Sequence, residues 1–301
     1  IRLNADGIWE LKHDAFPYSN YLAQLFQSNA EWLGANHDLD ELVLPTSIRQ
    51  TLAQQSVDIL PIDTLIAPVN GLNYNPRPYI QSYITYRKEI DALGAEKFYS
   101  VTAPSYLILR PQCIDGRYCI SEESQTTRAI INRYKFDQSS SNELLLKLAP
   151  QPKQSCYILQ ESGEAKIADW INVPSEPNSL TYFAADIDYS FLGLLRSLLY
   201  KPADFEVKLL VQKDDSSDST ESSFRMLRGI LSNGFLANRY VNSLSDNQAL
   251  YSADWAALGV VKKIAISSIS NSSFNHIYRY RFYKFTLNCE SGSSSRQPQT
   301  N

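Results

Sequence analysis

The sequence predicts an α+β protein in which an N-terminal α/β domain is followed by a C-terminal, jelly-roll-like β-sandwich. In the first half, stretches with helical apolar spacing alternate with short apolar runs, which is the pattern of β-α-β units. In the second half, short apolar or alternating runs follow one another closely with few helices between them, as in sandwiches and jelly rolls. We therefore expect an α/β domain over residues 1–137, a β-sandwich over 143–289 and a disordered tail over 290–301.

Length, composition and charge are those of an ordinary globular protein. The chain has 301 residues, of which 44% are hydrophobic and 20% charged, and at roughly 150 residues per domain this length suits two domains. The formal net charge of −4 disfavours nucleic acid as a partner, because nucleic acid attracts basic surfaces. We expect no nucleic-acid partner and no cofactor.

The sequence contains no segment that suits a membrane span or a signal peptide. The best apolar runs, residues 192–199 and 260–266, are far shorter than the roughly 20 residues that cross a bilayer. The first residues are polar and mixed, and the chain opens without Met. We expect a fragment of a longer protein.

The elements of the first half follow from periodicity and from boundary residues. Thr46 and Ser121 suit N-caps, and Glu122 and Glu123 suit an acidic first turn after Ser121. Apolar residues at helical spacing predict helices at residues 17–35, 47–55, 86–99 and 121–134. Short apolar runs predict strands at residues 57–61, 79–84 and 106–109.

After a polar segment at residues 138–142 that suits a turn or a linker, the second half is predicted to be mostly strands. One apolar helix is expected at residues 191–199, with Leu192, Leu195, Leu198 and Leu199 forming a stripe that packs on the sheet. A polar segment at 213–219 suits a hairpin tip. Strands are expected at residues 144–148, 156–160, 180–187, 205–212, 224–227, 260–267 and 277–287.

Aromatic and basic residues alternate along the last predicted strand, from Tyr278 to Phe285. One interpretation is a stacking platform for nucleic acid. The other is a two-sided strand with one aromatic core face and one solvated face. The acidic net charge favours the two-sided strand.

Cys113 and Cys119 flank a turn at Asp115-Gly116. In an oxidising compartment they are candidates for a disulfide, and otherwise they are two unpaired thiols beside a turn. No zinc or other metal site is expected, because the three histidines, His13, His37 and His276, are scattered and adjacent to no cysteine.

No strong catalytic motif is present. The pair Asp186 and Asp188 would share one face of a strand, which suits either a metal site or an acidic turn at a strand end. His37, Asp38, Asp40 and Glu41 suit either a metal cluster or a solvated loop. The non-metal interpretation is favoured for both groups.

The candidate ligand site comprises two polar segments that a parallel sheet would bring together. If residues 79–84 and 106–109 were neighbouring parallel strands, the end of the first and the turn after the second would lie at the carboxyl edge, where open α/β sheets bind ligands, and Arg77 would lie at the opposite end of its strand. The alternatives are a structural entry to a core strand and a surface ion pair within the turn. The candidates are Arg77, Gln81, Ser82, Tyr83, Asp115 and Arg117.

Several segments resemble a block found in large, uncharacterised bacterial membrane proteins with many spans, where it lies in a soluble region after the transmembrane helices. The segments are residues 71–83, 103–109, 114–117, 192–202 and 234–236. The resemblance implies an extracytoplasmic location, on the periplasmic or cell-surface side, with a membrane tether in the full-length protein. It also implies the parent membrane domain as a partner.

The resemblance favours a non-catalytic domain that binds a glycan or packs on the membrane part. The membrane part of that family loosely resembles glycosyltransferases that use polyprenyl-linked sugars. The alternative is therefore part of a membrane glycosyltransferase whose active site needs the transmembrane portion. A free-standing hydrolase is a third option, for which the sequence offers no nucleophile and base pair.

Overall fold

The computed structural model describes residues 2–3, 9–10, 37–199, 204–212, 218–268 and 273–289. These residues form an α+β protein rich in sheet, with three mostly antiparallel sheets of four, five and five strands. A separate two-stranded sheet joins β1 (Arg2–Leu3) and β2 (Trp9–Glu10). His13, the helix predicted at 17–35, the tail at 290–301 and most of the polar segment 213–219 lie outside the described residues.

A mixed sheet carries the N-terminal half. Its strand order is β4-β3-β5-β7-β6, in which β3 is parallel to β4 and β5, while β7 is antiparallel to β5 and β6. The strands are β3 (Ser56–Leu60), β4 (Asn73–Tyr74), β5 (Tyr106–Leu109), β6 (Tyr134–Ser139) and β7 (Leu144–Leu148). The strands predicted at 57–61, 106–109 and 144–148 are therefore present.

Both faces of the mixed sheet are covered, which explains why β3 and β5 are continuous apolar runs rather than alternating ones. On one face, Ile59 and Ile108 pack with the short helices α3 (Thr46–Leu52) and α4 (Ile66–Val69). On the other face, Leu107 belongs to the larger core of the molecule.

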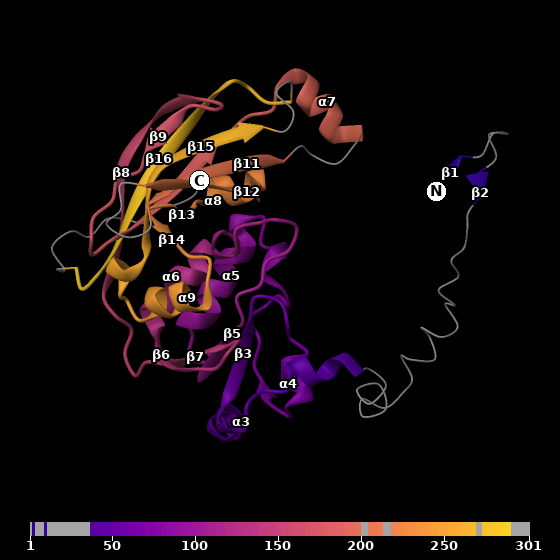
Figure 1. Ribbon diagram of the computed structural model, residues 1–301, viewed down its shortest axis with the longest axis vertical. Helices are drawn as coiled ribbons and strands as arrows, with labels where there is room; N and C mark the ends of the chain where they lie inside the picture. The colour runs from indigo at the N-terminus through magenta and orange to yellow at the C-terminus, as the bar shows by residue number, and fades with distance from the viewer. Residues whose placement is uncertain are drawn as a thin grey trace.

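Three helices lie between the mixed sheet and the C-terminal sheets: α5 (Lys88–Tyr99), α6 (Ser124–Arg133) and α9 (Leu244–Tyr251) (Figure 1). One cluster of buried side chains runs through this layer. It joins Leu107 of the mixed sheet, Phe98 of α5, Ile131 of α6 and Val207 of a C-terminal sheet. The two halves of the chain therefore share a hydrophobic core.

The two C-terminal sheets are antiparallel, with strand orders β13-β10-β16-β8 and β12-β11-β15-β14, and β9 pairs with β15 beside this path. Strand β11 alternates buried and half-buried residues along its whole length, as expected for a sheet with one face on a core. The strands are β8 (Ser155–Lys166), β9 (Trp170–Asn172), β10 (Leu180–Asp186), β11 (Phe205–Gln212), β12 (Ser219–Met226), β13 (Phe235–Leu236), β14 (Arg239–Tyr240), β15 (Gly259–Ser268) and β16 (Ile277–Leu287).

Short elements complete the chain between these strands. The helices are α7 (Phe191–Leu199) and α8 (Arg228–Asn233), and the 3-10 turns are η1 (His37–Leu42), η2 (Ser82–Ile84), η3 (Cys119–Ser121) and η4 (Trp255–Ala257).

Strand β16 is two-sided, as the sequence favoured. Tyr278, Phe282 and Phe285 are buried, and Arg281 and Lys284 form ion pairs with acidic side chains. The register shifts between Phe282 and its successor where β16 pairs with β8. The extra residue of this irregularity, Gln160, lies in β8, and the pairing of β16 with β10 stays regular from Arg279 to Phe285.

The strand predicted at residues 79–84 is wrong. This segment is a loop that ends in η2, and the strand of this region is β4, several residues earlier. Pro76 and Pro78 lack the N–H groups that a ladder requires. The N–H of Ser82 instead donates to the carbonyl of Pro61 at 3.0 Å.

The predicted start of α6 also differs. Ser121 lies in η3, where its hydroxyl donates to the carbonyl of Tyr118 at 2.6 Å, and α6 begins at Ser124. Glu122 and Glu123 precede the helix and pair with arginines. Similarly, Thr46 is the first residue of α3, not its cap.

The junction expected at residues 137–143 lies inside the β6–β7 hairpin. Residues 144–148, assigned by the prediction to the second domain, form β7 and pair with β5 in the mixed sheet. Of the two interpretations of the polar segment 138–142, a turn or a linker, the structure confirms the turn, because the segment joins the end of β6 to β7. Turn residues look alike in hairpins and linkers, so composition does not separate the two.

The helix predicted at 191–199 is present as α7, but its leucine stripe does not pack on a sheet. Leu192, Leu195, Leu198 and Leu199 are all exposed, and Gly193 is the buried residue of this helix. Amphipathic spacing predicts an apolar face, but does not say what covers it.

Two disulfides cross-link the structure. Cys113 and Cys119, the candidate pair, are joined, and Cys156 is joined to Cys289. The second bridge connects the start of β8 to the residues that follow its neighbour β16. All four cysteines lie in the described part of the chain, and all are paired there.

We expect the two bridges to differ in their effect on stability. Their sequence separations are 133 and 6 residues, and a longer loop removes more entropy from the unfolded chain. Replacing Cys156 and Cys289 with Ala should lower the free energy of unfolding by about 5 kcal/mol, against about 2 kcal/mol for Cys113 and Cys119. Urea unfolding of the two double variants measures this, and equal losses would contradict it.

Candidate functional site

A pocket of about 770 Å³ lies at the junction between loops of the N-terminal half and strand ends of the C-terminal half. Three groups of lining residues come from separate parts of the sequence: the η2 segment, the Asp115 turn, and the region from β10 to α8. They are Tyr83, Ile84, Tyr86, Asp115, Arg117, Asp186, Ile187, Tyr189, Asp204, Arg225, Leu227, Arg228, Gly229 and Ser232.

Backbone contacts hold the walls of the pocket together. The N–H of Arg225 donates to the carbonyl of Gly116 at 2.9 Å, so that Arg117 and Arg225 form a parallel bridge between the two halves. Asp115 has a φ of 56°, a left-handed conformation that Asp tolerates better than most residues. The carboxylate of Asp115 lies 3.3 Å from the guanidinium group of Arg225 in β12.

A close approach of backbones sets the position of α8. A Cβ atom on Gly229 would lie 1.7 Å from the carbonyl oxygen of Tyr86. Only glycine permits this contact without a shift of one of the two segments. The first turn of α8 consequently rests against the loop that carries Tyr83 and Tyr86.

The charges of the pocket are arranged in pairs. Arg225 donates from Nε to Asp204 at 2.7 Å and lies 3.3 Å from Asp115. Asp186 accepts from Arg281 at 2.6 Å. Carboxylates and guanidinium groups thus line the same space without a large excess of either sign.

Arg228 closes one side of the pocket. Its Nε donates to the carbonyl of Ile187 at 2.7 Å, and its Nη2 lies 3.3 Å from Asp188. Its guanidinium group also lies 4.9 Å from the centre of the Tyr189 ring, within the range of a cation–π contact. Asp186 and Asp188 therefore serve as ion-pair partners.

Arg117 connects the pocket to the protein interior. Its Nη1 donates to the carbonyl of Tyr83 at 3.1 Å and to Glu122 at 3.2 Å. Burial raises the pKa of Glu122 to about 7, although the positive charge of Arg117 acts in the opposite direction. A carboxyl group that titrates near neutrality therefore lies directly behind the pocket wall.

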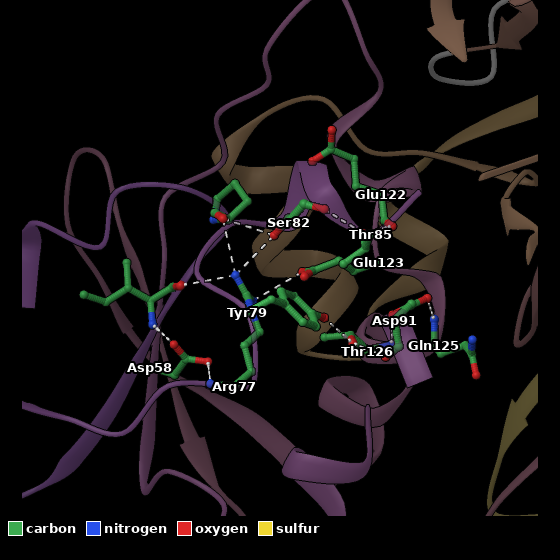
Figure 2. A network of polar contacts seen from close by, with 12 residues as sticks. Asp58, Arg77, Tyr79, Ser82, Thr85, Asp91, Glu122, Glu123, Gln125 and Thr126 are labelled. Atoms are coloured by element: carbon green, nitrogen blue, oxygen red, sulfur yellow. Dashed lines mark hydrogen bonds and ion pairs between the residues drawn. The ribbon is translucent and has the colours of Figure 1, made fainter. Parts of the chain in front are cut away.

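A network of buried polar side chains lies next to this wall (Figure 2). Arg77, whose side chain is fully buried, is 3.3 Å from Glu123, and its backbone N–H donates to Asp58 at 3.1 Å. Burial lowers the pKa of Arg77, but the charges of Glu123 and Asp58 outweigh this effect, and the pKa is raised. Burial raises the pKa of both carboxyl groups.

The same network caps α6 from outside the helix. Asp91 of α5 accepts hydrogen bonds from the N–H groups of Gln125 and Thr126, at 2.8 and 3.0 Å. It also accepts from the side chain of Asn233 at the end of α8. One buried carboxylate thereby joins three helices and satisfies donors that the first turn of α6 leaves free.

The predicted site residues divide between the pocket and the network. Tyr83, Asp115 and Arg117 line the pocket. Arg77 and Ser82 are buried in the network, where Arg77 Nη2 lies 3.3 Å from the hydroxyl of Ser82. Gln81 is half-buried and belongs to neither group.

Sequence reasoning missed most of the C-terminal wall. Tyr189, Asp204, Arg225 and Arg228 carry no motif, and each reaches the pocket through contacts between distant segments. In the sequence, the signal at Asp186 is limited to its spacing from Asp188. Within the residues that the structure describes, no group of His, Cys, Asp or Glu side chains is arranged to hold a metal ion.

Comparison with known proteins leaves the family open. No protein-family model matches the sequence, no curated protein matches it, and no solved structure matches the fold. In the described part of the chain, no helix is long and apolar enough to cross a membrane.

We expect the Arg77–Glu123 pair to behave as a unit. Replacing Arg77 with Met leaves Glu123 buried without its partner, which should cost about 3–5 kcal/mol in the free energy of unfolding. Combining Arg77→Met with Glu123→Leu should recover about half of this loss, because Glu123 is then no longer a buried charge without its partner, while Asp58 keeps its backbone N–H donors. Urea unfolding of the single and double variants measures the coupling, and additive losses would contradict it.

Glu122 should make stability depend on pH. Because its pKa is raised from 4.5 to about 7, the folded state holds a proton that the unfolded chain releases above pH 4.5. The contribution of Glu122 to the free energy of unfolding is therefore greatest below pH 4.5. It falls by at most about 3 kcal/mol as the pH rises toward 7. Urea unfolding at pH 5 and pH 7 should show a smaller decrease for Glu122→Gln than for the parent chain. An unchanged decrease would rule out Glu122 as its source.

Proposed function

We propose that this chain is a non-catalytic, extracytoplasmic domain of a membrane protein and that its junction pocket binds a carbohydrate. The observation that carries the proposal is the combination of Tyr83, Tyr86 and Tyr189 with carboxylate and guanidinium groups around one cavity. Aromatic rings pack against the C–H faces of sugars, and charged or amide groups bind their hydroxyls. A volume of about 770 Å³ is in the range of small-molecule sites.

The location and the fold of the C-terminal half belong to the same proposal. The two disulfides support an oxidising compartment outside the cytoplasm. The resemblance to soluble regions of bacterial membrane proteins supports a membrane tether and the parent membrane domain as a partner. Two antiparallel sheets that contribute to one core support a sandwich-like arrangement of the strands from β8 to β16.

A second candidate is part of a membrane glycosyltransferase whose active site needs the transmembrane portion. The carboxylates of Asp115, Asp186 and Asp204 around the pocket favour it, because carboxylate groups act as acids, bases and nucleophiles in reactions at glycosidic bonds. All three are paired with arginines here. Because these carboxylates are held in ion pairs, we favour a binding role for the pocket over a catalytic one.

A glycan array with the purified chain, followed by calorimetry with the best ligand, tests the binding proposal. Tyr86→Ala should weaken binding about tenfold, because one stacking surface is lost. Tyr99→Ala is the matched control, since Tyr86 and Tyr99 are 51% and 50% exposed and Tyr99 lies outside the pocket. Asp115→Asn, which keeps the shape of the turn, should also weaken binding.

Two outcomes would contradict the proposal. Failure of the chain to bind any glycan on the array would remove the pocket as a carbohydrate site. Equal weakening by Tyr86→Ala and Tyr99→Ala would place the binding surface elsewhere.

A further inference from the structure

Helix α7 presents an apolar face that the described residues leave exposed. Six large apolar side chains of this nine-residue helix are between 45% and 77% exposed. At 100° per residue they span an arc of about 160°, wider than the stripe of roughly 100° that suffices for packing on a core. They are Phe191, Leu192, Leu194, Leu195, Leu198 and Leu199.

Contacts at the start of α7 fix the direction of this face. The N–H of Ser190 donates to the carbonyl of Ser273 at 3.1 Å, and the rings of Tyr189 and Phe274 stack with centroids 5.1 Å apart. The helix extends from this base at the edge of the molecule, beside β11 and away from α5, α6 and α9 (Figure 1). The apolar face is therefore turned outward by an anchored segment.

The charge of α7 complements an anionic lipid surface. The helix contains no acidic residue, and Arg196, its one charged residue, is exposed and flanks the apolar arc, about 40° beyond Leu192 at 100° per residue. An apolar face with a cation beside it is typical of helices that lie in the lipid–water interface.

The size of the face argues against a second copy of the chain. A helix of this length is about 13.5 Å long, and a stable protein interface buries roughly 800 Å² on each partner, so a protein partner would have to contact elements beside α7 as well. It is also a convex ridge, so a protein partner would need a matching groove. Acyl chains adapt to the ridge without a preformed surface.

We propose that α7 inserts its apolar face into the interface of a lipid bilayer and so attaches this domain to a membrane surface. The site is separate from the carbohydrate pocket, and the proposal does not depend on a sugar being bound. Because α7 follows Tyr189 of the pocket wall after one residue, insertion would hold the pocket close to the bilayer.

Flotation of the purified chain with protein-free vesicles tests the proposal. The chain should float with vesicles of phosphatidylcholine and phosphatidylglycerol, and the double variant Leu195→Glu, Leu198→Glu should lose at least tenfold in bound fraction. The control is Ile80→Glu, Ile277→Glu, whose positions are 64% and 56% exposed and lie outside α7. Arg196→Ala should weaken binding to anionic vesicles more than to vesicles of phosphatidylcholine alone.

Circular dichroism and glycan binding show whether the variants keep their fold. If the double Glu variant does not fold, Leu198→Ser, a smaller change at a position that is 75% exposed, replaces it. Failure of the parent chain to float, or an equal loss in the control pair, would overturn the proposal. A dimer in light scattering that the α7 variants abolish would also overturn it, because a second copy would then cover the face. If the parent chain floats with vesicles but binds no glycan, only the proposed function is contradicted.

Discussion

The buried charge of Arg77 constrains the elements around it, because an unpaired charge in the interior costs several kcal/mol. Glu123, just before α6, supplies the opposite charge, and Asp58 of β3 accepts from the backbone N–H of Arg77. The carbonyl of Pro61 and the hydroxyl of Ser82 lie within 3.3 Å of the same guanidinium group. The loop after β4, the end of β3 and the start of α6 are thereby held at one point.

Hydrogen bonds also connect this network in the N-terminal half to the wall of the pocket. Glu122, adjacent to Glu123, pairs with Arg117, and Arg117 fixes the carbonyl of Tyr83 in the wall. Asp91 connects α5 and α6 to Asn233 at the end of α8. The segment of Tyr83, the turn of Arg117 and the end of α8 come from distant parts of the chain, yet each is bonded to a buried carboxylate or to its arginine partner. Buried polar groups of this kind favour one arrangement because the alternatives leave them unpaired.

The pocket and α7 suggest a molecule with a polar recognition site beside an apolar attachment site. Arg228 and Tyr189 form the side of the pocket that leads into α7, and the rings of Tyr189 and Phe274 secure the base of that helix. A ligand held in the pocket would lie near whatever surface α7 contacts. The proposed carbohydrate pocket and the proposed membrane-binding helix are therefore neighbours in the structure.

The sequence by itself determined the local elements whose signals are short-range. Strands such as β5, β11 and β16 and helix α7 follow from apolar periodicity, and the turn at Asp115 follows from Asp-Gly chemistry. Only the tertiary structure decided that Arg77 and Glu123 meet, that β7 joins the mixed sheet, and that the leucines of α7 remain exposed. The physical reason is that periodicity specifies which face of an element is apolar, whereas partners far apart in sequence decide what covers that face and which charges are paired.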